Sequence, residues 1–189
     1  MPMAMKKQGE ARTKESIRTI MLTVNGNQFE LTTCDGAELR KSFSYDVYQW
    51  DRLIYTLREK LRLTGTKLSC DRGACGACSV LIDGRLALSC LVLTVDCDGK
   101  EITTIEGLSD PTTGKLHPVQ EAFIENNAAQ CGFCTPGMII SAKALLDKNP
   151  EPSEEDVKWA LAGNICRCGN YRFISQSVLA AAAKMRKAG

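Results

Sequence analysis

The chain has 189 residues, 44% of them hydrophobic, and a formal net charge of +2. This length suits one ordinary domain or two compact ones, and the near-neutral charge gives no reason to expect binding to nucleic acid or to an anionic membrane. No apolar run approaches the length of a membrane span, and residues 1–16 are polar, as in a disordered, solvated tail rather than a secretory signal. We therefore expect a cytoplasmic protein that keeps its ten cysteines reduced.

The first half of the chain predicts a small sheet packed on one helix. Apolar residues alternate over residues 20–24 and 29–31, and Asn25-Gly26 between them is a strong hairpin signal. Apolar spacing of three to four residues predicts a helix over residues 53–61. Further strands are expected at residues 80–82, just before Cys90 and at residues 101–105, with Asp83-Gly84 as a second tight turn. Together these elements form a β-grasp pattern, which we assign to a domain over residues 17–108.

The second half predicts four helices. They are expected at residues 118–125, 137–146, 153–163 and 175–187. Thr135 is the expected N-cap of the second helix, and Ser153 is expected to begin a capping box for the third. The segment SDPTTGK at residues 109–115 marks the boundary, so the second domain covers residues 109–189. The predicted fold class is therefore α+β, with a β-grasp domain followed by a four-helix domain.

Eight of the ten cysteines form two sets of four, one in each half of the chain. The first set is Cys70, Cys75, Cys78 and Cys90. Its C-x4-C-x2-C…C spacing is that of plant-type [2Fe–2S] sites, where three thiolates come from one tight loop and the fourth from a neighbouring strand. Gly73 and Gly76 lack a Cβ, so they let the loop turn tightly and bring N–H groups close to sulfur.

The second set is Cys131, Cys134, Cys166 and Cys168. Its first pair directly precedes the helix expected near Thr135, and the partial positive charge of a helix N-terminus favours thiolate. Arg167 and Arg172 could add positive charge, although a solvated arginine is the simpler interpretation of each. Two cluster-binding sets in one chain predict electron transfer.

Other interpretations of the cysteines remain open. Disulfides are disfavoured because an internal protein keeps thiols reduced, whereas four thiolates in short pairs also suit structural Zn²⁺. Cys34 and Cys97 belong to neither set and are expected to be small buried residues. The lone histidine, His117, precedes a helix start, where capping or loop packing is a better interpretation than metal binding. Phe133 is expected to pack in the core.

At these motifs the chain resembles the small iron–sulfur subunit, with two clusters, of the xanthine oxidase family of molybdenum hydroxylases. The runs that carry the resemblance are residues 63–67, 70–78, 116–120, 130–137 (QCGFCTPG) and 163–168 (GNICRC). The last two runs are highly specific. The resemblance covers the chain from about Ile20 onward. It departs from the family pattern at Ser69, where glycine is common, at Gly169-Asn170, where Thr-Gly is common, and in extra residues between Thr33 and Arg52.

This resemblance implies a ferredoxin-like first domain, a helical [2Fe–2S] domain and a role in electron transfer. It implies that Gln130 and Cys168 approach the molybdopterin of a large partner subunit, and that electrons pass on through both clusters to a flavin subunit or another acceptor. The reaction would belong to the whole assembly, and the chain itself is expected to hold no catalytic residues.

Two other functions compete with this one: a free-standing two-cluster ferredoxin and a zinc-stabilised interaction module. The segment from residue 34 to 52 is longer than a strand-to-helix link requires and carries several aromatic residues. We expect it to contact a partner, with packing onto the chain's own sheet as the alternative.

Overall fold

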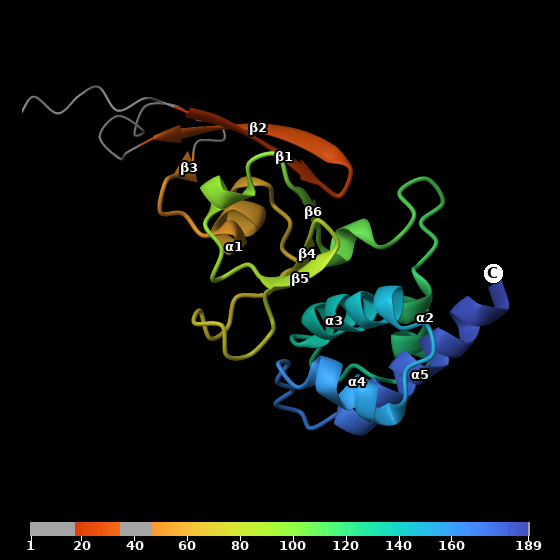
Figure 1. Cartoon of the computed structure of the whole chain (residues 1–189). Coiled ribbons are helices and arrows are strands. Elements are labelled where there is room, and N and C mark those ends of the chain that lie inside the picture. Colours follow the sequence, from red (N-terminus) through yellow and green to blue (C-terminus); the bar gives the residue numbers. More distant parts are fainter. Residues whose placement is uncertain (1–17, 35–46, 189) are drawn as a thin grey trace, which may run out of the picture.

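The structure is a computed structural model that describes residues 18–34 and 47–188 (Figure 1). The expected tail, residues 1–16, lies outside the described residues, as does most of the expected contact segment, residues 34–52. Near the end of that segment Tyr48 stacks on Trp50, with ring centroids 4.9 Å apart. Trp50 is exposed. The contact role of the segment stays a prediction.

Six strands form one mixed sheet in the described part of the chain. They are β1 (Arg18–Val24), β2 (Asn27–Cys34), β3 (Val47–Tyr48), β4 (Ser79–Ile82), β5 (Arg85–Leu88) and β6 (Glu101–Thr103). Their order is β3-β2-β1-β6-β4-β5, in which β1 runs antiparallel to β2 and parallel to β6. β4 runs antiparallel to both β5 and β6. This is the predicted small sheet with one helix packed on it.

Both predicted hairpin turns are present. The φ angles are 52° at Asn25, 79° at Gly26, 49° at Asp83 and 73° at Gly84. Positive φ at both central residues is the geometry of a type I′ turn, whose twist matches that of the paired strands. Asn-Gly and Asp-Gly adopt this backbone at little cost, which is why these dipeptides predicted the turns correctly.

The helix predicted over residues 53–61 is present but is not a regular α-helix. α1 covers Leu53–Tyr55 and continues as a π-helical turn, Thr56–Lys60. The Leu61 N–H reaches back five residues to the Thr56 carbonyl at 3.0 Å. Leu53, Ile54 and Leu57 are buried all the same. Apolar spacing reports only which side chains face the core, so it does not distinguish an α turn from a π turn.

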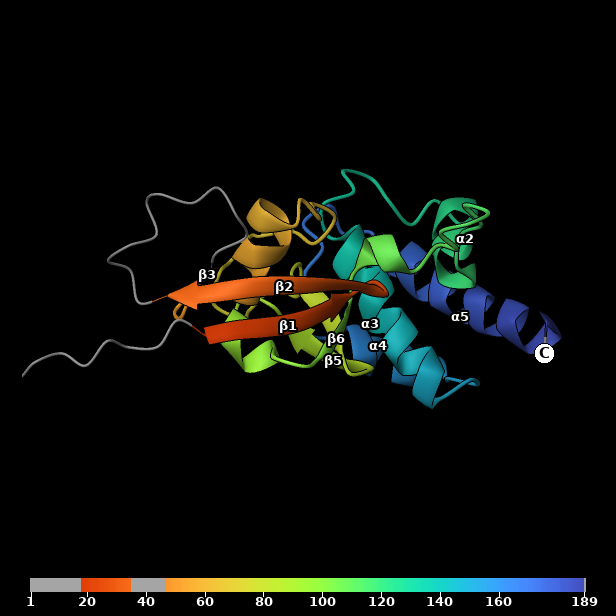
Figure 2. The ribbon, with the colours of Figure 1, turned by 90° about the horizontal axis from the view of Figure 1, so that it is seen from above.

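Four helices make up the second half, as predicted. They are α2 (Pro118–Glu125), α3 (Thr135–Lys148), α4 (Glu154–Leu161) and α5 (Tyr171–Ala188). α3 lies between the sheet and the other helices (Figure 1), and it contacts β4 and β5 on one side and α4 on the other. Figure 2 shows α5 extending away from the sheet. α5 begins four residues earlier than predicted, because the Ile174 N–H already donates to the Asn170 carbonyl at 3.1 Å.

The helix caps confirm two predictions and correct one. Ser153 forms the predicted capping box with Asp156, and the His117 side chain accepts a hydrogen bond from the Val119 N–H at 3.2 Å. The assignment of Thr135 as an N-cap is wrong. Thr135 is the first residue of α3, and its buried hydroxyl has no hydrogen-bond partner in the described residues. The residue at the cap position is Cys134, whose carbonyl accepts from the Met138 N–H at 3.0 Å.

Each half has its own buried apolar core. The core of the sheet half contains residues such as Leu22, Leu31 and Leu53, and the core of the helical half contains Met138 and Val178. Leu81 of β4 packs into the helical core. A third, small cluster places Ile54 of α1 against Cys78 and Cys90. The two halves therefore meet at β4, next to the first cysteine set.

Candidate metal centres

The first cysteine set is gathered where the loop before β4 meets the end of β5. Cys78 and Cys90 are buried, and Cys70 and Cys75 are half-buried. The thiols lie in two close pairs: Cys70 interacts with Cys75, and Cys78 interacts with Cys90. The structure thus brings together all four residues predicted for this site.

The loop backbone is shaped to present N–H groups to sulfur. Gly73 and Gly76 have φ angles of 76° and 68°, a region in which a Cβ causes strain. The Ala74 N–H donates to Cys70 Sγ at 3.2 Å. Hydrogen bonding from the Arg72 backbone, with further contributions from Cys75 and Ala74, lowers the pKa of Cys70 to about 7. Such a loop stabilises negative charge on sulfur before any metal is bound.

The inner pair behaves differently because it is buried. Burial raises the pKa of Cys78 to about 12, and the adjacent Cys90 thiol disfavours a second negative charge. A metal that binds to Cys78 must therefore displace a tightly held proton from this thiol. The apolar surroundings of the pair also limit the access of water to the site.

The second set joins the start of α3 to the connection between α4 and α5. Cys131 interacts with Cys168, and both are exposed, whereas Cys134 interacts with the buried Cys166. The predicted set is again complete and again consists of two pairs.

The two cysteines before α3 differ in the direction of their pKa shifts. A hydrogen bond from the Phe133 backbone, followed by one from Cys168, lowers the pKa of Cys131. Burial and the nearby Cys166 instead raise the pKa of Cys134 to about 12, since burial disfavours the charged form of a thiol. Neither shift has the start of α3 as its cause, so the effect of the helix N-terminus on this set stays a prediction.

The pairwise arrangement fits a two-iron cluster better than a single ion. Structural zinc needs four ligands around one point, whereas a [2Fe–2S] cluster with four cysteines takes two thiolates at each iron. Among residues 18–34 and 47–188, no three His, Cys, Asp or Glu side chains converge closely enough to hold one metal ion. Each half instead presents two neighbouring thiol pairs beside glycines with positive φ, and four cysteines in this arrangement provide the donor set that a [2Fe–2S] cluster requires.

The two sets lie against each other. The Ile165 N–H, next to Cys166, donates to the Cys75 carbonyl at 2.9 Å. Beside it the buried Asn164 donates to the Gly76 carbonyl at 3.1 Å and accepts from the Ser141 hydroxyl at 2.9 Å. Asn164 belongs to a motif noted in the sequence, but nothing in its local spacing indicated that it joins the two halves.

Gln130 lies at the edge of the second set, as its sequence position implied. It is exposed, and its side chain donates to Asn170 Oδ1 at 3.4 Å. Asn170 also donates to the Asn127 carbonyl at 3.1 Å, which ties the chain after Cys168 to the loop before Cys131. Gln130 and Cys168 are therefore both available on one exposed face.

Two cysteines and one aromatic residue lie outside the sets. Cys97 is buried, as expected, and burial raises its pKa to about 11. The side chain of Cys34 lies outside the described residues. The expectation that Phe133 packs in the core is wrong, because this ring is 45% exposed. The loop between Cys131 and Cys134 projects it outward.

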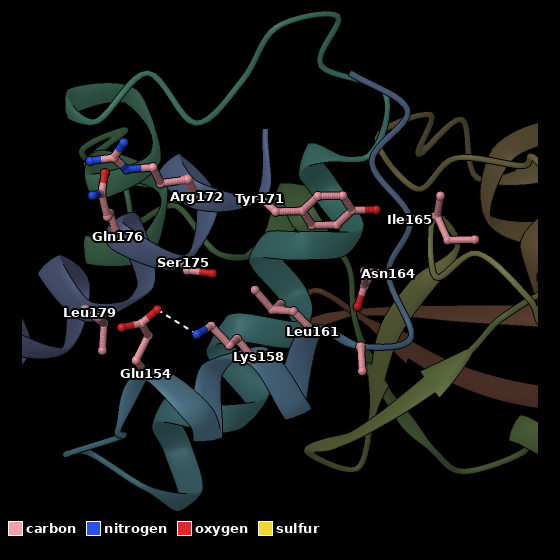
Figure 3. A pocket seen from close by; sticks show the side chains of 11 residues that line it. Glu154, Lys158, Leu161, Asn164, Ile165, Tyr171, Arg172, Ser175, Gln176 and Leu179 are labelled. Atoms are coloured by element: carbon pink, nitrogen blue, oxygen red, sulfur yellow. Dashed lines mark ion pairs between the residues drawn. The ribbon is translucent and has the colours of Figure 1, made fainter. Parts of the chain in front are cut away.

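A groove in the helical half has no cysteine among its lining residues. This groove of about 950 Å³ runs between α4 and α5, with Lys158, Leu161, Tyr171 and Leu179 among the residues that line it (Figure 3). At its inner end Tyr171 accepts a hydrogen bond from the Cys166 N–H at 2.8 Å. This hydrogen bond places the groove next to the second cysteine set.

Comparison with known proteins identifies the family. A family model described as a [2Fe-2S] binding domain matches residues 104–179. The chain is 43% identical over 169 residues to a nicotinate dehydrogenase subunit of Pseudomonas putida, and the match covers 89% of this chain and 98% of that relative. The chain belongs to the small [2Fe–2S] subunits of molybdenum hydroxylases of the xanthine dehydrogenase and aldehyde oxidoreductase family. It is an electron-transfer subunit of oxidoreductase complexes.

Solved structures confirm the fold of this iron–sulfur subunit. Quinoline 2-oxidoreductase from Pseudomonas putida 86 matches with a TM-score of 0.78 and 38% identity over 90% of this chain and 97% of that chain. The aldehyde oxidoreductase of Desulfovibrio desulfuricans matches with a TM-score of 0.79 and 41% identity, but the match covers 17% of that longer chain. No helix in the described part of the iron–sulfur subunit is long and apolar enough to cross a membrane.

Proposed function

We propose that the eight paired cysteines bind two [2Fe–2S] clusters and conduct electrons from a large molybdopterin-binding subunit towards a flavin subunit or another acceptor. A bound [2Fe–2S] cluster supplies one-electron transfer. We also propose that residues 17–108 and 109–189 are separate domains, each holding one cluster. The observation that carries the proposal is the presence of two complete sets of paired thiols, joined by the hydrogen bond between Ile165 and Cys75.

The exposure of the cysteines supports an order in which electrons pass through the two sites. Cys131 and Cys168 are exposed beside Gln130, so this face of the second set is available to a molybdopterin held by a partner. Cys78 and Cys90 are buried in the sheet half, and the hydrogen bond from Ile165 to Cys75 connects their loop to the second set. The second set is thus the entry site, and the first set leads towards the acceptor.

Exposed apolar side chains near the second set support a bound partner rather than a free-standing ferredoxin. Phe133, Ile165, Tyr171 and Phe173 are each 45% to 54% exposed, and they neighbour Cys134, Cys166 or Cys168 in sequence. Large apolar residues of this kind anchor protein interfaces. We propose that the molybdopterin-binding subunit covers them.

Purification of the native protein from its source under anaerobic conditions tests this function. We expect about four irons and four sulfides per chain, two distinguishable signals in electron paramagnetic resonance (EPR) after reduction, and co-elution with a molybdenum-containing subunit. A chain that elutes alone with its iron would support the free-standing ferredoxin. Stoichiometric zinc with almost no iron would contradict both.

A further inference from the structure

Backbone hydrogen bonds fix Arg52, the residue before α1, against the segment that carries Cys90. The Leu53 N–H donates to the Val92 carbonyl at 2.8 Å, and the Ile54 N–H donates to the Ser89 carbonyl at 3.1 Å. The position of Arg52 is therefore set by the same stretch of chain that presents the last cysteine of the first set.

The guanidinium group of Arg52 bridges the two ends of that set. Its Nη1 donates to the Asp71 carbonyl at 3.2 Å and to the Cys90 carbonyl at 3.5 Å. Its Nη2 donates to Asp71 Oδ2 at 2.6 Å and to the Tyr55 hydroxyl at 3.1 Å. Asp71 directly follows Cys70, so one cation contacts both the first and the last cysteine segment. Only the planar fork of arginine provides donors in several directions at once.

The negative charge of Asp71 is compensated by the guanidinium group of Arg52. Its Oδ2 accepts from Arg52 and from the Tyr55 hydroxyl at 3.1 Å, whereas its Oδ1 is buried without a partner in the described residues. Its φ of 54° holds the carboxylate beside the loop. The hydrogen bond to Asp71, with smaller contributions from Tyr55 and Cys90, raises the pKa of Arg52. Arg52 is therefore a permanent cation, and its loss would leave a carboxylate uncompensated.

We propose that Arg52 is a positioning residue that, through its ion pair with Asp71, sets the reduction potential of the first [2Fe–2S] site. This inference rests on the proposed function. The potential of such a cluster depends on nearby charge and hydrogen bonding. A cation stabilises the additional negative charge of the reduced form, and an anion destabilises it. In the native pair the two effects partly cancel, so removal of either partner shifts the potential, in opposite directions.

The size of the shift is limited by solvent. The side chains of Arg52 and Asp71 are 32% and 31% exposed, so water screens part of their charge. We expect each single substitution to change the equilibrium constant for reduction by roughly threefold to tenfold. For a one-electron couple a tenfold change corresponds to about 59 mV.

A redox titration of the whole assembly, followed by EPR, tests the proposal. Arg52→Gln should lower the midpoint potential of the first site, Asp71→Asn should raise it, and the double variant should return close to the native value. Arg85→Gln is the matched control, because it removes an exposed, solvent-screened arginine of β5 that lies outside both cysteine sets, and it should leave the potential of the first site unchanged. All four variants should leave the signal of the second site unchanged.

The outcomes separate this inference from the proposed function. If the native protein lacks two EPR signals, the proposed function fails. If it has both signals but Arg52→Gln and Asp71→Asn leave the potential unchanged or shift it in the same direction, the pair has only a structural role and the inference is wrong. If Arg52→Gln loses iron, two other variants decide the matter: Arg52→Lys, which retains the charge, should keep a potential close to the native value, and Asp71→Asn should still raise it. A fall in potential with Asp71→Asn would overturn the inference.

Discussion

At the scale of single residues, the thiols within one set differ in their affinity for protons. Cys70 has a pKa of about 7, held low chiefly by the Arg72 backbone, while burial raises the pKa of Cys78 to about 12. Metal ligands bind as thiolates, so loading of the metal releases protons and becomes more favourable as the pH rises. Cys70 therefore forms a thiolate more readily than Cys78 does.

Cys168 provides a test of whether the two sets are independent sites. Replacement of Cys168 by serine should abolish the cluster of the helical half and leave the first cluster assembled, because each half has its own complete set and its own core. Iron content should fall by about half, one of the two EPR signals should disappear, and turnover of the assembly should drop sharply.

Cys97→Ser is a useful control for this experiment, since Cys97 lies outside both sets. It should retain both EPR signals. Loss of both clusters in a folded Cys168→Ser protein would show that the ligands are not divided as proposed.

At the scale of secondary structure, the start of α3 is packed against the first cysteine loop. A Cβ at Gly137 would overlap the Gly76 carbonyl oxygen, and a Cβ at Gly76 would come within 2.7 Å of the Gly163 carbonyl oxygen. Two glycines in contact allow the loop that carries Cys75 and Cys78 to approach the helix that follows Cys134. The distance between the two halves is therefore decided by backbone contact.

Gly137→Ala should destabilise the protein although alanine is the better helix former. Intrinsic propensity alone favours alanine by about 1 kcal/mol, but the overlap with a backbone oxygen should cost roughly 1–3 kcal/mol or more. We expect a lower midpoint of thermal unfolding. Gly163→Ala is the matched control, because a Cβ there meets open space, and its effect should stay within about 0.5 kcal/mol. A Gly137→Ala protein as stable as the native one would mean that the two halves are not held in close contact.

At the scale of the whole molecule, several of the exposed apolar side chains lie close to the second set, among them Phe133, Ile165 and Tyr171. Ile165 is 54% exposed between the buried Asn164 and the buried Cys166. The adjoining groove between α4 and α5 has Ile165 and Tyr171 in its lining (Figure 3). Exposure of these residues does not stabilise an isolated chain, whereas in a subunit of a complex they can form the contact with a partner.

Ile165→Asp should weaken assembly without loss of iron. The side chain is exposed and only its backbone binds Cys75, so the fold and both clusters should remain. A charge placed in an apolar contact should lower the affinity for the molybdenum-containing subunit by about tenfold or more, which is about 1.4 kcal/mol. Binding titration with the purified partner measures this. Leu86→Asp, on the exposed side of β5, is the control and should bind normally; equal binding by both variants would remove Ile165 from the interface.

The features of this protein that depend on short-range chemistry could be predicted from its amino-acid sequence. The positive φ required at Asn25-Gly26 and Asp83-Gly84 identified both hairpins, and the spacing of the cysteines identified both sets. Ser153 and His117 identified two helix starts, because a capping residue acts on backbone groups two or three residues away. Each of these features depends on residues that are close together in the sequence, so it can be recognised without knowledge of the rest of the fold.

The contacts that join distant segments of the chain could not be predicted from the sequence. The pairing of Cys134 with Cys166, the insertion of Asn164 against Gly76 and the bridge from Arg52 to Asp71 connect residues that are distant in the chain. Burial raises the pKa of Cys134, whereas Phe133 in the same loop is exposed, because burial depends on what packs around a side chain rather than on its neighbours in sequence.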